Sequence, residues 1–366
     1  MLRIRHWIAR RLSHLDPILL VLVLLLLGIS VAVVASASGQ SPARITGHLM
    51  NIAFALGVMV VMANVPPHLL ARVGLPLYAA GVVLLIAVAL FGEVRNGSRR
   101  WLDLGVVAFQ PSELLKLALP LMLAWYFQRN EAVLRAKHYL VGTTLLAVPS
   151  LLILRQPDLG TALMIGVSGF YLLYFAGLPW KVILGGGVAL GASLPLAWGF
   201  LHDYQQRRVL TLLDPSTDPL GAGYHIIQST IAIGSGGLFG KGWMQGTQTQ
   251  LDFIPERTTD FVFAVFGEEF GYVGMVLLVA LHLALVARGF TIAAHAPTLF
   301  GRLMAATLTL NLFTYVFVNM GMVSGILPVV GVPLPLMSYG GTALVTLLLG
   351  VGILMSVATH RQLNKT

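Results

Sequence analysis

Charged residues are scarce in this 366-residue chain, and cysteine is absent. Lys, Arg, Asp and Glu make up 10% of the sequence, whereas soluble domains carry about 25%. This shortage excludes a soluble enzyme, a disordered chain and a nucleic-acid-binding module, and we expect no nucleic-acid partner. Without cysteine, any loop that faces an oxidising space must fold without disulfides.

Several short catalytic signatures are also missing. The sequence has no P-loop, no GxGxxG after an apolar strand, no GxSxG and no HExxH. We therefore expect neither an organic cofactor nor a structural zinc ion.

Long apolar stretches dominate what is present, since 57% of the residues are hydrophobic and the mean hydropathy is +0.84. About 20 apolar residues span the hydrocarbon core of a bilayer. Ten stretches approach that length, at residues 17–37, 49–65, 74–92, 111–127, 139–154, 160–177, 182–201, 260–287, 302–323 and 341–359. The sequence therefore predicts an all-α polytopic membrane protein with about ten transmembrane helices in a single integral domain, residues 1–366.

The distribution of charge predicts how these helices are oriented. Lys and Arg are enriched in the loops that share a side with both termini, as is typical of cytoplasmic loops. We therefore place both termini in the cytoplasm and the protein in the cytoplasmic (inner) membrane. Most Asp and Glu residues then lie outside, as does the longest loop, residues 202–259 between the seventh and eighth helices. The apolar, glycine-broken centre of this loop predicts an interfacial or re-entrant helix.

Ionisable residues at membrane depth are costly and are therefore candidate functional residues. Glu113 and Lys116 lie three residues apart on one helix face, where they can pair. This pair is either a self-neutralising structural element or a polar patch in an outward-facing cavity. Asp158 occupies an N-cap position before the sixth stretch, where it either only caps the helix or faces a ligand. Arg155 beside it offers a cation for an anionic ligand.

The densest polar cluster, at Glu256, Arg257, Thr258, Thr259 and Asp260, precedes the eighth stretch. Asp260 is a candidate N-cap, with Thr259 as its competitor. A carboxylate in a cleft at the membrane edge is also a candidate general base, because its pKa is open to tuning.

Two further acidic residues, Glu268 and Glu269, lie deeper in the same predicted helix. Adjacent carboxylates inside a membrane helix are hard to explain as lipid-facing. We expect at least one of them to meet a cation such as Lys116 or to be protonated.

A proline- and glycine-rich stretch, GILPVVGVPLPLMSYGG, separates the last two predicted helices. Irregular backbone near membrane depth is tolerated where it is buried in protein or lines a cavity. The stretch is either a rigid external loop or the wall of a cavity into which Ser338 and Tyr339 donate hydroxyl groups.

Six motifs in this order resemble the SEDS family of shape, elongation, division and sporulation proteins, and the likeness covers nearly the whole chain. They are NGSRRWLDLG, FQPSELLKLA, RQPDLGTA, DPLGAGYHIIQS, PERTTDFVFAVFGEEFGYVG and GVPLPLMSYGGTA. Within the family, the chain is most similar to the rod-shape branch. The resemblance implies a peptidoglycan glycosyltransferase that polymerises lipid II on the outer face of the cytoplasmic membrane. It also implies a class B penicillin-binding protein and other membrane proteins of the elongation complex as partners.

The resemblance also implies roles for the candidate residues. Asp260 matches the family's aspartate in the pattern E-x-x-T-D-F and is the expected catalytic base. The substrate pyrophosphate needs cations, for which the candidates are Lys116, Arg155, Arg207, Arg208 and Arg257. Glu113, Asp158, Glu256, Ser338 and Tyr339 complete the expected substrate-binding set. We also expect a divalent cation, Mg²⁺ or Mn²⁺, because only oxygen ligands are on offer, with Asp260, Asp158 and Glu113 as candidates.

Two other functions suit a polytopic protein with buried charges. A lipid II flippase would explain ten helices with intramembrane charges, although the acidic residues crowd on one side. A non-catalytic scaffold for the penicillin-binding protein would leave those charges unexplained.

Overall fold

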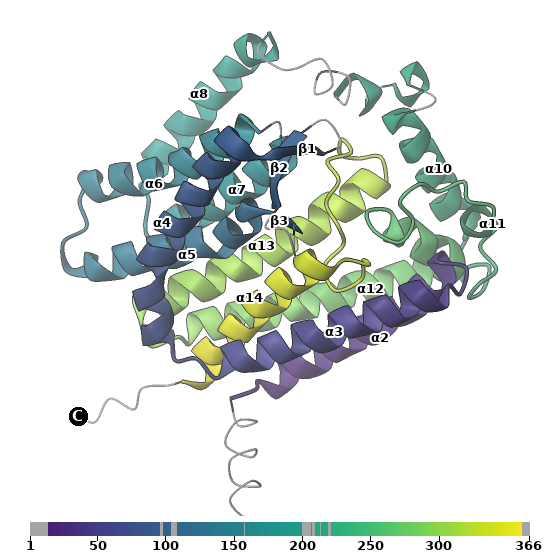
Figure 1. Ribbon diagram of the computed structural model, residues 1–366, viewed down its shortest axis with the longest axis horizontal. Coiled ribbons are helices and arrows are strands. Elements are labelled where there is room, and N and C mark those ends of the chain that lie inside the picture. The colour runs from purple at the N-terminus through teal and green to yellow at the C-terminus, as the bar shows by residue number, and fades with distance from the viewer. Residues whose placement is uncertain are drawn as a thin grey trace, which may run out of the picture.

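The structure, a computed structural model, describes residues 14–95, 98–103, 108–156, 158–199, 206, 209–212, 214–218 and 221–360. Long helices dominate it (Figure 1). The first half contributes α2 (Pro17–Ala37), α3 (Pro42–Ala63), α4 (Pro67–Phe91), α5 (Pro111–Arg129), η1 (Glu131–Val133), α6 (Ala136–Leu154), α7 (Leu159–Phe175) and α8 (Trp180–Trp198). The second half contributes η2 (Pro215–Thr217), α10 (Ala222–Ser235), α11 (Thr247–Gln250), α12 (Val262–Ala294), α13 (Leu299–Val323) and α14 (Gly341–Thr359).

Each of the ten predicted apolar stretches overlaps one long helix of the described chain, namely α2 to α8 and α12 to α14. Seven of these helices are long and apolar enough to cross a membrane. The apolar parts of α7 and α8 are shorter, and α5 carries Glu113 and Lys116. The all-α membrane fold is confirmed, while the number and direction of the crossings stay predictions.

Proline starts several of these helices. It occupies the first position of α2, α3, α4 and α5, where its fixed φ suits a helix and its missing N–H has no helical partner to lose. At α2, the Asp16 carboxylate also caps the helix by accepting from the Leu19 N–H at 3.0 Å.

A small antiparallel sheet lies between α4 and α5 in addition to the predicted helices. Its strands are β1 (Glu93–Arg95), β2 (Ser98–Asp103) and β3 (Ala108–Phe109), in the order β1-β2-β3. β1 and β3 are too short to show a pattern, and β2, SRRWLD, does not alternate apolar and polar residues, so the sequence does not reveal these strands.

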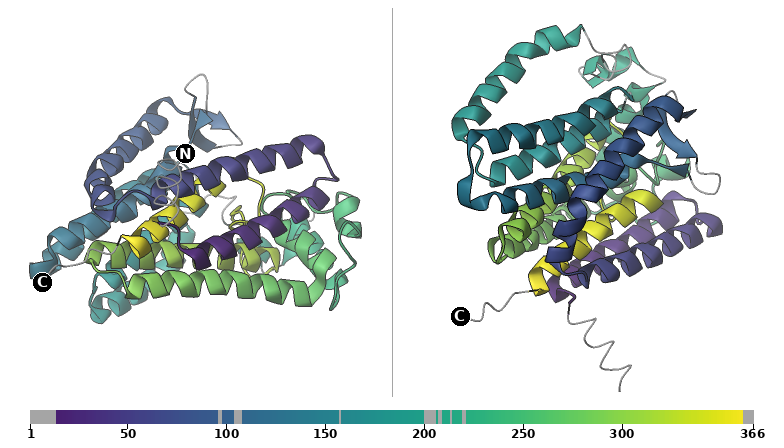
Figure 2. Two further views of the ribbon diagram at one scale, coloured as in Figure 1. Left: turned by 90° about the horizontal axis from the view of Figure 1, so that it is seen from below. Right: turned by 60° about the vertical axis from the view of Figure 1, so that its left-hand side comes forward.

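The bundle is built on three main helix pairs, in which α14 packs against α3, α4 against α5, and α12 against α13. Figures 1 and 2 show α2 and α3 side by side next to α12 and α14, whereas α8 lies at the periphery. The buried side chains form one apolar core shared by α2, α5, α12, α13 and α14. The loop between α13 and α14 returns into this bundle.

α12 is broken at Gly271, whose φ of 66° and ψ of −166° are not helical. The N–H groups of Tyr272 and Val273 donate instead to the carbonyls of Gly237 and Leu238, at 2.9 and 3.0 Å. The glycine-rich loop that follows α10 therefore supplies hydrogen bonds that the helix lacks at the break. α10 and this loop occupy the segment predicted to be interfacial or re-entrant, and its depth in the membrane stays a prediction.

Contacts between distant segments divide the bundle into two ends. At one end, Arg288 of α12 binds Asp16, and Arg302 of α13 lies 3.6 Å from Glu131. At the other end, the Arg257 side chain donates to the Ala37 carbonyl at the end of α2. This arrangement agrees with helices that alternate in direction, and it leaves open which end faces the cytoplasm.

We expect single cysteines to define the two sides, because the natural chain contains none. Gln250→Cys should react with a membrane-impermeant maleimide on intact cells, whereas Val133→Cys and His295→Cys should react only after permeabilisation. All three native side chains are exposed. Labelling of position 250 from the inside alone would reverse the predicted orientation of this end of the bundle.

Candidate active site

A cavity of about 580 Å³ lies among α5, α7, α13, α14 and the loop before α14. Six predicted site residues line it, namely Glu113, Lys116, Asp158, Asp260, Ser338 and Tyr339. Six more polar residues, not predicted from the sequence, line its wall: Gln110, Thr161, Asn311, Tyr315, Thr342 and Thr346. They are uncharged, so no cost of burying a charge marks them in the sequence, although an asparagine inside an apolar stretch is a usable signal.

Asp260 lies just before α12, with its carboxylate in the cavity wall. The predicted N-cap role is wrong, because Phe261 occupies that position and no side chain caps the helix. Within the described residues, the Asp260 carboxylate has no hydrogen bond or ion pair. Burial raises the pKa of Asp260 to about 6, and the negative charge of Glu256 contributes to this rise in pKa.

Lys116 and Glu113 form the ion pair that their spacing predicts, with 2.6 Å between Lys116 Nζ and Glu113 Oε1. The other Glu113 oxygen accepts from Thr346 at 3.4 Å, and the Lys116 ammonium lies 5.5 Å from the centre of the Tyr315 ring. Both charged side chains keep part of their surface accessible, at 19% and 16%. The pair therefore neutralises itself and also faces the cavity.

Asp158 caps α7, as predicted, and also lines the cavity. One carboxylate oxygen caps α7 by accepting from the Thr161 N–H at 3.1 Å, and the other lies 3.5 Å from the Gln110 amide. The side chain is buried and lines the cavity. Arg155 ends α6 as its C-cap and does not line the cavity.

Of the remaining predicted cations, one does not line the cavity and two lie outside the described residues. Arg257 turns away from it, donating to the carbonyls of Ala37 and Thr249 at 2.5 and 2.8 Å and pairing with Asp252. Arg207 and Arg208 lie outside the described residues. Within the described part of the chain, Lys116 is thus the one predicted cation that lines the cavity.

Glu256 and Ser338 support the segment around Asp260. Glu256 is exposed and accepts from the Thr259 hydroxyl at 2.9 Å. Ser338 is buried, and its hydroxyl donates to the Thr259 carbonyl at 2.5 Å while accepting from the Leu334 N–H at 2.8 Å. Ser338 therefore fastens the backbone, and its hydroxyl is already engaged; Tyr339 is half-buried in the cavity wall.

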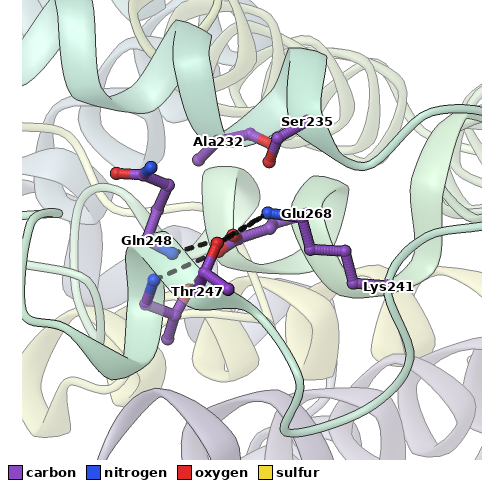
Figure 3. A network of polar contacts seen from close by, with 7 residues as sticks. Ala232, Ser235, Lys241, Thr247, Gln248 and Glu268 are labelled. Carbon is purple, nitrogen blue, oxygen red and sulfur yellow. Dashed lines mark hydrogen bonds and ion pairs between the residues drawn. The ribbon is translucent and has the colours of Figure 1, made fainter.

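Glu268 forms a separate buried network away from the cavity (Figure 3). Its carboxylate accepts from Lys241 Nζ and the Gln248 N–H, both at 2.8 Å, and from the N–H and hydroxyl of Thr249. The prediction that one of the two adjacent glutamates meets a cation is confirmed, but that cation is Lys241 of the glycine-rich loop after α10 and not Lys116. Glu268 thus fastens the loop between α10 and α11 to α12.

The three acidic residues proposed as metal ligands line one cavity but do not form a metal-binding group. Within the described residues, no group of three or more His, Asp or Glu side chains is arranged to hold a metal ion. Asp158 is engaged as a cap and Glu113 with Lys116, so only the Asp260 carboxylate is uncommitted. The described side chains thus contain no preassembled site with three acidic or histidine ligands, and a bound divalent cation stays a prediction.

These features define a class: a multi-pass membrane protein whose polar site lies within its helix bundle. The chain belongs to the FtsW, RodA and SpoVE family, because that family's profile, described as a cell cycle protein, matches residues 16–363.

Relatives of known name agree with this family. The chain is 53% identical over 351 residues to the peptidoglycan glycosyltransferase MrdB of Escherichia coli K12, covering 96% of this chain and 95% of that protein. It is 38% identical over 309 residues to a probable peptidoglycan glycosyltransferase FtsW of a Geobacter species, covering 82% and 83%. The predicted likeness to the rod-shape branch, RodA, is confirmed.

Two solved structures share the fold. A chain of a peptidoglycan synthase complex that coordinates polymerisation and crosslinking has a TM-score of 0.81 at 36% identity, over 94% of this chain and 97% of that one. The rod shape determining protein RodA of Thermus thermophilus has a TM-score of 0.72 at 31% identity, over 95% and 98%.

We expect Lys116→Ala and Glu113→Ala each to lower the rate of the enzyme about 100- to 1000-fold, the range typical of lost charge stabilisation in a transition state. The double exchange Glu113→Lys with Lys116→Glu keeps a pair but moves the cation along α5, so it should not restore the rate. Glu131→Ala, which removes an exposed pair far from the cavity, is the matched control. Full activity of the exchanged variant would make the pair purely structural.

Proposed function

We propose that this chain polymerises lipid II into β-1,4-linked glycan strands at the outer face of the cytoplasmic membrane, with Asp260 as the general base. Its family and close relatives make it a peptidoglycan glycosyltransferase. The observation that carries the proposal is the uncommitted Asp260 carboxylate, which shares one cavity with the Lys116–Glu113 pair.

The chemistry requires inversion at one carbon. In lipid II the sugar is α-linked to a polyprenyl pyrophosphate, whereas the product linkage is β, so a single displacement suffices and no covalent enzyme intermediate is needed. Asp260 accepts the proton of the acceptor 4-hydroxyl while the oxygen of that hydroxyl bonds to the anomeric carbon of the donor sugar. The bond to the pyrophosphate breaks at the same time, and Lys116 neutralises the charge that develops there.

The cavity suits a substrate with one polar and one apolar end. Many of its polar residues lie at the starts of α5, α7 and α14 or just before α12 and α14, and Asn311 and Tyr315 of α13 add to them; leucines such as Leu308, Leu347 and Leu354 line the rest. Thr342 and Leu354 are 12 residues apart on α14, or about 18 Å along the axis. The polar end can hold a pyrophosphate while the apolar end holds part of the attached hydrocarbon chain.

We also propose that a divalent cation, Mg²⁺ or Mn²⁺, arrives bound to the pyrophosphate of the substrate. Within the described residues, no three acidic or histidine side chains are arranged to hold a metal ion by themselves. Glycan synthesis measured with a chelator and with added Mg²⁺ or Mn²⁺ tests this part of the proposal.

We also propose a class B penicillin-binding protein as partner, within an elongation complex that shapes rod cells. The similar chain in the peptidoglycan synthase complex supports this assignment, because that complex coordinates polymerisation with crosslinking. A partner of this kind would crosslink the strands that this chain makes.

Purified protein incubated with lipid II separates this proposal from its two alternatives. A polymerase produces glycan strands, whereas a flippase or a scaffold produces none. If the folded, purified protein makes no glycan even when the penicillin-binding protein is added, transport or scaffolding is favoured.

We expect Asp260→Asn and Asp260→Ala to lower the polymerisation rate at least about 100-fold, since loss of a general base typically costs ~10²- to 10⁴-fold. The protein should remain folded, because the native carboxylate makes no hydrogen bond or ion pair to any described residue. Asp214→Asn, which alters the exposed carboxylate that caps η2, is the control. Strand synthesis by Asp260→Asn at the natural rate would remove Asp260 from the mechanism.

We expect kcat/KM to rise with pH through about 6, because the base works only when it is deprotonated and burial raises the pKa of Asp260 to about 6. Glu256→Gln removes a negative charge that favours the protonated form. It should therefore lower the pKa of Asp260 and move the acidic limb of the profile to lower pH. A limb that stays in place in this variant would contradict the assignment of the limb to Asp260.

A further inference from the structure

The side chain of Asn319 lies behind Asp260, in the last two turns of α13. It is fully buried, with 0% of its surface exposed. Its amide nitrogen donates to two backbone carbonyls, that of Asp260 at 2.8 Å and that of Val332 at 2.6 Å. One side chain thus joins the segment before α12 to the loop before α14.

The chemistry of the neighbours fixes the orientation of this amide. Both groups in contact are carbonyl oxygens, which accept hydrogen bonds only, so the two hydrogens of the Asn319 amide must point at them. The amide oxygen is buried and has no hydrogen-bond partner. Asn319 therefore acts here as a double donor, which no apolar side chain can imitate.

The loop that Asn319 holds passes close to the reactive group. A Cβ added at Gly331, next to Val332, would lie 3.4 Å from Asp260 Oδ2, and the φ of Gly331 is +70°. Ser338 of the same loop donates to the Thr259 carbonyl at 2.5 Å, and the Tyr339 N–H donates to the Thr258 carbonyl at 2.8 Å. The backbone before and at Asp260 is thus fastened at three successive carbonyls, while its carboxylate stays free.

We propose that Asn319 is a positioning residue, which holds Asp260 and the loop around Gly331 in the arrangement needed for the acceptor hydroxyl to be deprotonated. This inference rests on the proposed role of Asp260 as the base. Asn319 does not line the cavity and touches no substrate; it acts through the backbone of Asp260.

Loss of this amide has two separable consequences. The carbonyls of Asp260 and Val332 lose a buried donor, so the segment shifts toward water to satisfy them. A displacement of about 1 Å at a reacting group can lower a rate about 100-fold. The shift also lessens the burial of the carboxylate, which lowers the pKa of Asp260 toward the ordinary aspartate value of about 4.

The test compares Asn319→Ala with Thr309→Val in the purified full chain, with lipid II as substrate. Thr309 lies on the same helix, is equally buried and donates one hydrogen bond, to the Ala305 carbonyl at 2.7 Å, but it does not line the cavity. We expect Asn319→Ala to lower kcat about 10- to 100-fold with little change in KM. The acidic limb of kcat/KM should move below pH 6, and Thr309→Val should keep both the natural rate and the natural limb.

A merely structural role gives a different result. Asn319→Ala would then lower the melting temperature and the amount of folded enzyme, while kcat per folded molecule and the acidic limb stayed as in the natural protein; that outcome overturns the proposal. If Asn319→Ala does not fold, Asn319→Ser, which keeps one donor, is judged by the same two measurements. Asp260→Asn in the same series keeps the two hypotheses apart. If Asp260→Asn is active, the proposal that Asp260 is the base is wrong. If Asp260→Asn is inactive while Asn319→Ala is unaffected, only the proposed positioning role of Asn319 is wrong.

Discussion

A charge buried among apolar helices has to be neutralised in place, and this constraint governs the arrangement of the polar side chains in the bundle. Glu268 is fully buried and receives hydrogen bonds from Lys241 and from the backbone of Gln248 and Thr249. Lys116 is paired with Glu113 along one helix. Against this background the Asp260 carboxylate stands out, since no described residue binds it and burial raises its pKa to about 6.

The same constraint applies to backbone groups, because unpaired N–H and C=O groups are as costly inside a bundle as unpaired side chains. Where α12 breaks at Gly271, the glycine-rich loop after α10 supplies the missing hydrogen bonds. In the loop before α14, Asn319 and Ser338 meet carbonyls and an N–H that no regular helix satisfies. The chain can therefore keep irregular backbone around the cavity.

The helices and much of the site could be predicted from the sequence because their signals are local. Ten apolar stretches mark ten long helices, and the spacing of Glu113 and Lys116 predicts their pairing. The partner of Glu268 could not be predicted, because Lys241 is 27 residues away in the sequence. It reaches Glu268 because the glycine-rich loop after α10 folds back onto α12. The predicted N-cap at Asp260 failed because a cap depends on where the helix begins, and α12 begins two residues later, at Val262. Asn319 was missed because it carries no charge.

Asp260, as the proposed general base, meets two opposing requirements. Its carboxylate must stay free of hydrogen bonds and ion pairs to keep its basicity, yet a free side chain on a loose segment would not hold the geometry that proton transfer needs. The structure separates the two by fastening the backbone at Thr258, Thr259 and Asp260 while leaving the Asp260 side chain uncommitted. The unpaired carboxylate costs stability, and the buried donors Ser338 and Asn319 offset part of that cost next to it. The hydrogen bonds that fasten the loop before α14 to this segment are therefore a condition for the role proposed for Asp260.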